Sequence, residues 1–260
     1  MFAHRSFLFC LLAGSLACTR ATPPPDSEGP AAAAKPAAEG ARPAGPTVDV
    51  EGTVHLEGTA PVLPPVPTNE SVSRACGTSI PDRSLEVSPD GGLVDAVVWV
   101  DAPAQPAPAD TEGGAALPVL SLNQTHCDYA PHVLAGRVGQ KLQIVNSDPL
   151  VHSIHGAENG RTLFNFAQPI TGMRAERALP STPGVLALRC ELHPWMHAAV
   201  RVFDHPYYAL TDGAGHFQIK GVPEGHHTLT VWQPKLGARA LPLDVKAGMG
   251  PVTVRWRPGA

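Results

Sequence analysis

The sequence predicts an all-β protein that combines a β-sandwich with a second, smaller β-sandwich module. Short segments alternate apolar and polar residues, turns rich in glycine and proline separate them, and no long stretch has a strong helical period. Several short strands with frequent turn signals are typical of a sandwich. At 260 residues, the chain is long enough for one large domain or two small ones.

The first 18 residues are expected to be an export signal. A short basic region precedes a mostly apolar stretch, Ser6–Leu16, which is too short to span a bilayer. The run Gly14–Cys18 resembles a bacterial lipoprotein processing site, although Ser15 stands where leucine is usual. We therefore expect lipidation at Cys18, and the alternative is an ordinary secretory signal in which Cys18 is incidental.

Residues 19–46 are rich in alanine and proline and are expected to form a disordered tether, because such a composition cannot build a packed core. Together with the signal, the tether predicts a protein of the bacterial periplasm or cell envelope, held to the membrane through a lipid anchor. Thr19 fits outer-membrane sorting by resemblance to known lipoproteins. The net charge of −4 and the lack of lysine and arginine clusters predict no nucleic-acid partner.

A first domain is expected over residues 47–203. Its predicted strands are Val48–Leu56, Leu93–Val100, Lys141–Val145, Val185–Leu188 and Ala198–Phe203. The segment 48–100 either supplies strands to this domain or forms a unit of its own, and the simpler hypothesis makes it the first sheet of one enlarged sandwich.

A second module is expected over residues 204–260, after a break near Asp204–Pro206. Its predicted strands are Tyr207–Thr211, His216–Ile219, Thr228–Trp232, Leu241–Val245 and Val252–Trp256. A module of this size is near the lower limit for independent stability, so we expect it to pack on the first domain.

One short motif indicates a metal site. In Cys190-Glu-Leu-His193-Pro-Trp-Met196, a thiolate, an imidazole and a thioether share one loop between two predicted strands. His152, which follows a turn-rich run after an upstream strand, supplies a second imidazole. Two histidines, one cysteine and a weak axial methionine suit a blue-copper site, which serves one-electron transfer.

Three cysteines remain after Cys10 and Cys18 are set aside: Cys76, Cys127 and Cys190. Because an exported protein meets an oxidising compartment, two of the three are expected to pair. Sequence alone allows three pairings. We favour Cys76–Cys127, since Cys190 lies within the ligand motif; a disulfide at Cys190 would exclude the copper site.

The region from about Gly136 to Phe203 resembles the cupredoxins, and within them amicyanin and plastocyanin. The shared segments are Pro149–His155, Phe164–Phe166, Thr182–Gly184 and Cys190–Met196. The resemblance implies a cupredoxin-type Greek-key β-sandwich that binds one type 1 copper ion through His152, Cys190, His193 and Met196.

Two positions complicate that resemblance. The related proteins usually have asparagine directly after the first histidine ligand, where it ties the two ligand loops together, and here Ser153 takes its place. This difference is expected to loosen the site or shift its potential without abolishing binding. His155 competes with His152 as first ligand; spacing alone does not decide, and the resemblance favours His152.

The C-terminal part resembles transthyretin-like or carboxypeptidase-regulatory-like modules through Thr211–Ile219 and Gly221–Gly225. These modules are β-sandwiches without catalytic residues. Their pattern therefore bears on the fold and hardly at all on function.

These features predict an electron carrier and not an enzyme. Multicopper enzymes need further coppers bound by His-x-His pairs, which the chain lacks, and arginine and glutamate, not histidine, flank Cys190. The expected electron-transfer surface is His193, Pro194 and Trp195, and the expected partner is a redox protein such as a cytochrome c or a periplasmic dehydrogenase. The alternative is a non-catalytic copper carrier or cell-surface binding protein.

Overall fold

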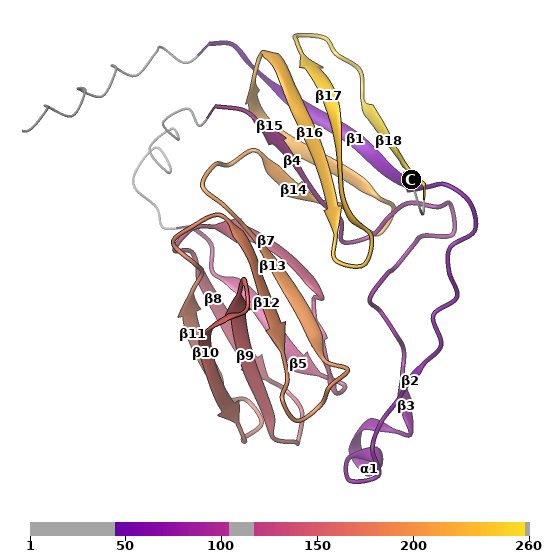
Figure 1. Cartoon of the computed structure of the whole chain (residues 1–260), viewed down its shortest axis with the longest axis vertical. Coiled ribbons are helices and arrows are strands. Elements are labelled where there is room, and N and C mark those ends of the chain that lie inside the picture. Colours follow the sequence, from indigo (N-terminus) through magenta and orange to yellow (C-terminus); the bar gives the residue numbers. More distant parts are fainter. Residues whose placement is uncertain (1–44, 104–116, 258–260) are drawn as a thin grey trace, which may run out of the picture. The chain divides into compact units, whose positions relative to one another are not determined.

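The computed structural model describes residues 45–103 and 117–257, and these are folded almost entirely into strands, which confirms the predicted all-β class. Figure 1 shows the strands gathered into layered sheets. The predicted signal peptide, the lipidation site Cys18 and nearly all of the predicted tether lie outside the described residues. In the part of the chain that is described, no helix has the length and apolar character needed to cross a membrane.

The first group of strands, here called sandwich A, consists of two sheets with the strand orders β10-β9-β12-β13-β7 and β11-β8-β5-β6. Its strands are β5 (Leu120–Thr125), β6 (Asp128–Ala130), β7 (Val133–Arg137), β8 (Lys141–Asn146), β9 (His152–Glu158), β10 (Arg161–Gln168), β11 (Arg174–Ala178), β12 (Gly184–Arg189) and β13 (His197–Phe203). Between the sheets lies one apolar cluster that includes Leu122, Tyr129, Leu142, Ile144, Ile154, Leu186, Leu188 and Val200.

The second group, sandwich B, pairs its strands in the orders β15-β1-β18 and β14-β4-β16-β17. Its strands are β1 (Thr47–Leu56), β4 (Val97–Asp101), β14 (Tyr208–Leu210), β15 (His216–Pro223), β16 (Gly225–Gln233), β17 (Gly237–Val245) and β18 (Val252–Trp256). Its core is a separate apolar cluster that includes Val50, Val54, Val98, Ile219, Leu229, Val231 and Val254.

The partners of β1 and β4 differ from the expectation that segment 48–100 extends the copper-binding sandwich. β1 pairs with β15 and β18, and β4 pairs with β14 and β16, so both strands belong to sandwich B. Sandwich B is therefore assembled from two distant stretches of the chain. The physical reason is that the C-terminal strands alone could bury little apolar surface, and the added strands enlarge their core.

Between β1 and β4 the chain makes an excursion that contains β2 (Val66–Pro67), the short helix α1 (Ser73–Cys76) and β3 (Ser79–Ile80). Cys76 at the end of α1 forms a disulfide with Cys127, in the turn between β5 and β6, with 5.7 Å between the Cα atoms. This is the pairing that the sequence favoured, and Cys190 is left as a free, buried thiol.

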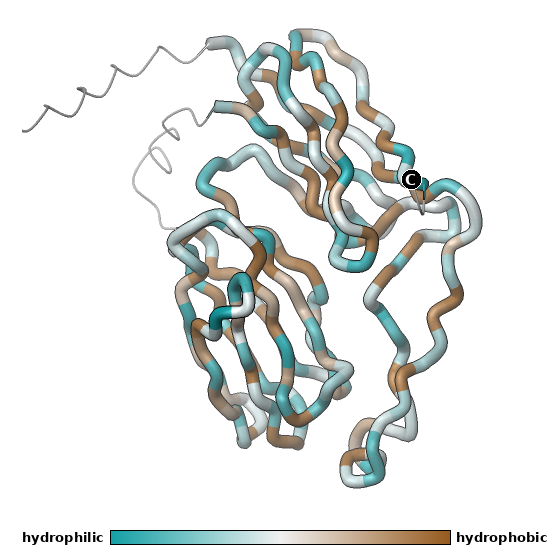
Figure 2. The backbone as a smooth tube through the Cα atoms, viewed as in Figure 1, coloured by the Kyte–Doolittle hydropathy of each residue, from teal (hydrophilic) through white to brown (hydrophobic). Residues whose placement is uncertain are grey.

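Hydrophobic and hydrophilic residues alternate along many of the strands (Figure 2). In β8, for example, every second residue is buried, as expected for a strand that presents one face to a core. In β9, six of the seven residues are buried, so both faces are covered and no alternation marks the strand in the sequence. β9 begins at His152, one of the predicted ligands.

Candidate metal centre

Strand pairing brings the two predicted ligand segments together. β12 is antiparallel to β9, with Arg189 opposite His155. Cys190 follows Arg189 directly, so it comes beside the first residues of β9, where His152 lies. The loop from Cys190 to Met196 then returns to the sheet as β13. Predicted ligands that are about forty positions apart in sequence therefore meet at one end of sandwich A.

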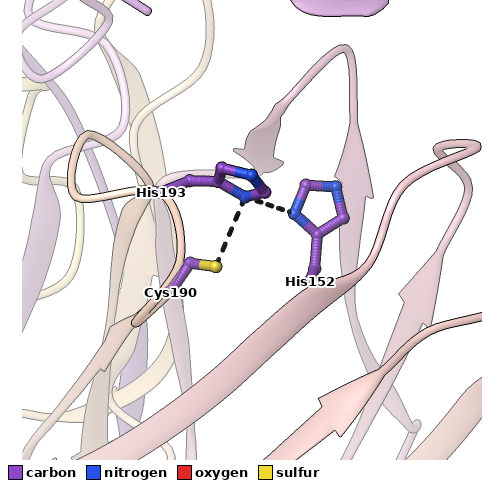
Figure 3. Close-up of side chains that lie close together, drawn as sticks. All are labelled: His152, Cys190 and His193. Carbon is purple, nitrogen blue, oxygen red and sulfur yellow. Dashed lines mark hydrogen bonds between the residues drawn. The ribbon is translucent and has the colours of Figure 1, made fainter. Parts of the chain in front are cut away.

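Three of the four predicted ligands converge there (Figure 3). One ligand atom each from His152, Cys190 and His193 lies within 4.8 Å of the others. His152 Nδ1 is 3.0 Å from His193 Nδ1, and His193 Nδ1 is 3.5 Å from Cys190 Sγ. All three residues are buried, with relative exposures of 0, 3 and 3%. The two imidazole nitrogens and the sulfur thus face a common point that is shielded from water.

Two backbone hydrogen bonds close the ligand loop. The Cys190 N–H donates to the Met196 carbonyl at 3.2 Å, and the Met196 N–H donates to the His193 carbonyl at 2.9 Å. The side chain of Met196 is fully buried in the same apolar cluster as Cys190. The loop therefore positions Met196 near the thiol, and its role as an axial ligand stays a prediction.

Ser153 makes the link between the ligand segments that asparagine usually provides in the proteins this region resembles. The Glu191 N–H donates to Ser153 Oγ at 2.8 Å, which ties the loop after Cys190 to β9. The Ser153 N–H lies 3.4 Å from Cys190 Sγ and donates to it, and Ser153 Oγ lies 3.6 Å from the same sulfur. A shorter side chain thus retains the connection.

Cys190 is placed to act as a thiolate. Burial raises the pKa of its thiol, but hydrogen bonds from His152, His193 and Ser153 outweigh burial and lower the pKa to about 5. A thiolate is the form of cysteine that binds metals. At neutral pH this residue is therefore ready to serve as a soft metal ligand.

Asp148 was not among the residues predicted from the sequence, but it contacts the cluster through His152. His152 Nε2 donates to Asp148 Oδ2 at 2.9 Å. Burial lowers the pKa of His152, but the bond to Asp148 prevails and raises it; burial of Asp148 is likewise outweighed, so the pKa of its carboxyl is lowered. Metal-binding histidines commonly donate their second N–H to a carboxylate. An aspartate four residues before a predicted histidine ligand was therefore the signal in the sequence that could have indicated this hydrogen bond.

His155 does not join the cluster. Its Nδ1 pairs with the Glu191 carboxylate, and its Nε2 lies 2.8 Å from Thr162 Oγ1. The geometry therefore favours His152 over its rival as the histidine of β9 that could bind a metal.

The structure differs in one respect from the predicted electron-transfer surface of His193, Pro194 and Trp195. His193 is 3% exposed and not at the surface, whereas Pro194 is exposed and Trp195 is half-buried. Two apolar side chains next to the ligands are well exposed, Val151 at 44% and Leu192 at 47%. The position of His193 in a loop did not reveal that its side chain is buried, because the residues that cover it come from other strands.

The spacing of the three ligand atoms fits a metal ion. Bonds of about 2.0 Å to imidazole nitrogen and about 2.3 Å to thiolate sulfur place such atoms roughly 3.3–3.8 Å apart. The observed separations of 3.0 and 3.5 Å need only a small adjustment of the rings. A trigonal set of two histidines and a cysteine, with methionine nearby, is chemically suited to copper.

Comparison with known proteins gives partial matches. No family model matches the chain, and no curated protein matches it. Among solved structures, a purple cupredoxin from Nitrosopumilus maritimus is 26% identical, with a TM-score of 0.28, over 32% of this chain and 99% of that protein.

A copper-containing nitrite reductase (NirK) from Thermus scotoductus SA-01 is 23% identical with a TM-score of 0.30, and covers 39% of this chain. The match spans only 27% of the reductase. A mutant of amicyanin in its Cu(I) form is 18% identical with a TM-score of 0.28, over 41% of this chain and 98% of amicyanin. Each match covers less than half of the chain, so the function proposed below rests on the chain's own residues.

Proposed function

We propose that this protein is a type 1 copper protein that transfers single electrons between redox partners of the bacterial cell envelope. The observation that carries the proposal is the convergence of His152 Nδ1, His193 Nδ1 and Cys190 Sγ at one buried point. Copper bound there would supply a one-electron couple. The protein would supply two imidazoles, a thiolate and, from Met196, a weak axial thioether.

The donor set supports copper over harder cations. Calcium and magnesium take oxygen ligands, whereas this cluster offers a thiolate and two imidazole nitrogens. The hydrogen bonds that hold Cys190 as a thiolate favour a soft metal further.

Burial of the ligands supports electron transfer over catalysis. A catalytic metal site keeps an open position for water or substrate. Here the three ligand residues have exposures between 0 and 3%. A substrate would have to displace packed side chains to reach the metal, while an electron needs only a short path through a ligand.

The exposed apolar residues beside the ligands support a docking role. Val151 directly precedes His152, and Leu192 and Pro194 flank His193. Electron-transfer encounters use small interfaces that form and separate quickly. We propose a redox protein as partner, such as a cytochrome c or a periplasmic dehydrogenase, which would dock here.

The tether and anchor are part of the proposal. Residues 1–18 would direct export, lipid on Cys18 would hold the protein at the membrane, and residues 19–46 would give the folded part its reach. Cys18→Ala is expected to move the protein from the membrane fraction to the soluble fraction of cells. Retention of the variant in membranes would contradict the anchor.

The first test is visible absorption and electron paramagnetic resonance of the copper-loaded protein. We expect an intense blue band and narrow copper hyperfine splitting, both lost in Cys190→Ser. Met196→Leu should keep the band and alter the reduction potential, whereas Met173→Leu, at a residue 37% exposed, should change neither. A colourless loaded protein, or a spectrum unchanged by Cys190→Ser, would contradict the proposal. A stable, reversible potential distinguishes an electron carrier from a copper carrier.

A further inference from the structure

We propose that the disulfide-bonded turn between β5 and β6 positions both metal-binding histidines, with Asp148 as the positioning residue for His152 and Trp195 as that for His193. The inference rests on the proposed function and deepens it. It assigns a role at the metal centre to the disulfide between Cys127, in sandwich A, and Cys76, which lies outside it.

The turn needs support from outside itself. His126 and Cys127 form a two-residue connection between the paired residues Thr125 and Asp128. Their φ angles are 53° and 60°, in the left-handed region that such hairpin turns require. Glycine adopts this conformation freely, and asparagine and histidine adopt it more often than most other residues, whereas cysteine has no such preference.

Asp148 supplies part of that support. Its Oδ1 accepts the His126 N–H at 2.7 Å, and its Oδ2 accepts the Cys127 N–H at 2.8 Å. The disulfide from Cys127 to Cys76 supplies the rest. The carboxylate therefore holds both residues of the turn by their main chain.

The same carboxylate makes the first of two connections, here called arms, between the turn and the metal-binding histidines. Asp148 Oδ2 also accepts the His152 Nε2–H at 2.9 Å. The side chain of Asp148 is 9% exposed and that of His152 is not exposed, so water does not replace this bond. Because Asp148 occupies Nε2, Nδ1 is the ring nitrogen that faces Cys190 and His193 and is left to bind a metal.

Trp195 is the second arm. Its indole N–H donates to the Cys127 carbonyl at 2.8 Å. Its ring lies against the His193 ring, with 5.3 Å between centroids and 34° between planes. A tryptophan held at its polar end can fix the imidazole on which it packs.

Cys127 is thus the point where both arms meet. Its N–H is bound to Asp148, its carbonyl to Trp195 and its sulfur to Cys76, and its exposure is 2%. Loss of the disulfide is expected to loosen the turn and, through the two arms, both imidazoles. Loss of Asp148 removes its bond to His152 and both of its bonds to the turn, so it should affect His152 most and His193 to a smaller extent.

The first experiment uses the metal-free protein with nitrogen-15-labelled histidine. Nuclear magnetic resonance is expected to show a proton on His152 Nε2 in the wild type and a partial loss of that proton from Nε2 in Asp148→Ala. Asp128→Asn is the matched control, because Asp128 pairs with the imidazole of His132, 3.0 Å away, which is not a predicted ligand. A wild-type His152 with no proton on Nε2 would overturn the inference.

The second experiment uses the copper-loaded protein. Asp148→Ala and the double variant Cys76→Ser, Cys127→Ser are expected to bind copper about 10- to 100-fold more weakly, as is usual when a metal ligand loses its hydrogen-bonding partner. If the loss falls on the oxidised ion, the reduction potential rises by about 59 mV for each tenfold loss. The double variant should disturb the resonances of both histidines, and Asp148→Ala those of His152 more than those of His193.

The outcomes separate the two proposals. A wild type without a thiolate–copper band contradicts the proposed function, while the metal-free resonances still test the two arms. A blue wild type whose potential, affinity and histidine resonances are unchanged in both variants overturns this inference alone. If circular dichroism shows that a variant does not fold, Asp148→Asn replaces it. A proton that stays on His152 Nε2 to the same extent in Asp148→Asn as in the wild type would then overturn the inference.

Discussion

The two sandwiches of this protein are both built from two packed sheets, yet they differ in what they bury. Ten of the buried polar residues in the described part of the chain belong to sandwich A and its loops: Gln124, Gln140, Asn146, Asp148, His152, Ser153, His155, Glu158, Gln168 and His193. Sandwich B has three, which are Thr211, Thr230 and Gln233. Buried polar groups cost stability unless they are satisfied, so their concentration in one sandwich indicates where function lies.

Two of the three buried polar residues of sandwich B bond to the backbone, and the third, Thr230, donates to the Asp101 carboxylate at 3.4 Å. Thr211 Oγ1 donates to the Leu93 carbonyl at 2.7 Å and accepts the Ala96 N–H at 2.8 Å, and Gln233 Nε2 donates to the Ser84 carbonyl at 2.8 Å. In sandwich A, Gln140 and Asn146 also bond to the backbone, but His152 and His193 direct ring nitrogens at each other and at a sulfur. Two sandwiches of one fold class can therefore use buried polar groups either to satisfy the backbone or to build a candidate metal site.

The largest expected effects come from core truncation. Leu186→Ala in β12 and Leu229→Ala in β16 remove side chains that are 0 and 1% exposed, and each is expected to cost about 2–5 kcal/mol of unfolding free energy. Because β12 leads directly to Cys190, Leu186→Ala should also weaken metal binding, whereas Leu229→Ala should not. Urea denaturation and metal titration of both variants check this. Equal loss of metal affinity in both would remove the distinction between the sandwiches.

Metal binding should sharpen the difference between the two regions. At a free copper concentration about 100 times the dissociation constant, binding is expected to stabilise the folded state by about 2.7 kcal/mol. Amide hydrogen exchange should slow mainly in β9, β12 and β13, with little change in β16 and β17. His152→Ala should abolish the protection, and His216→Ala, at an exposed position of sandwich B, should not. Uniform protection of all strands would contradict a site confined to sandwich A.

Two glycines offer a smaller test. A Cβ at Gly52 in β1 would lie 2.2 Å from the Val252 carbonyl oxygen, which is part of the backbone of β18 and cannot turn aside. A Cβ at Gly156 in β9 would lie 2.3 Å from the ring of Phe164, which can shift. We expect each alanine substitution to cost about 1–3 kcal/mol, with Gly52→Ala the more damaging. Thermal unfolding measures both, and the reverse order would refute the argument.

Much of the fold was predictable because local pattern determines local structure. The alternation in β1, β8 and β15 reflects strands with one buried face, and the predicted segments coincide with them within a few residues. The close approach of Cys190 and His193 was also expected, since a short loop between two strands limits where its side chains can lie, while His152 was expected beside them through the resemblance to the cupredoxins. The spacing of residues within one loop can be read directly from the sequence.

What the sequence did not reveal depends on contacts between distant segments. The alternating pattern of β1 indicates a half-buried strand but not its partners, β15 and β18. β9 is covered on both faces and has no alternation to find. The bond from Asp148 to His152 and the burial of His193 arise from how loops fold over one another, which no period in the sequence records.

The smallest expected effect concerns pH and involves His132, in the turn before β7. Burial lowers the pKa of His132, but its bonds to Asp128, 3.0 Å away, and to the His197 carbonyl, 2.9 Å away, prevail and raise it. A raised folded-state pKa means that protonated His132 stabilises the fold below its ordinary pKa of about 6.5, and that this contribution is lost as pH rises through the higher folded value.

Chemical denaturation of wild type and His132→Gln checks this sign. The wild type is expected to be more stable by about 0.5–1 kcal/mol at low pH, where the histidine is charged, and the difference should shrink as the pH rises through the folded-state pKa of His132. Asp128→Asn removes the charge that raises the pKa, so it should flatten the same dependence. A wild-type advantage that grows with pH would mean that His132 is held neutral in the fold and that burial, not Asp128, controls it.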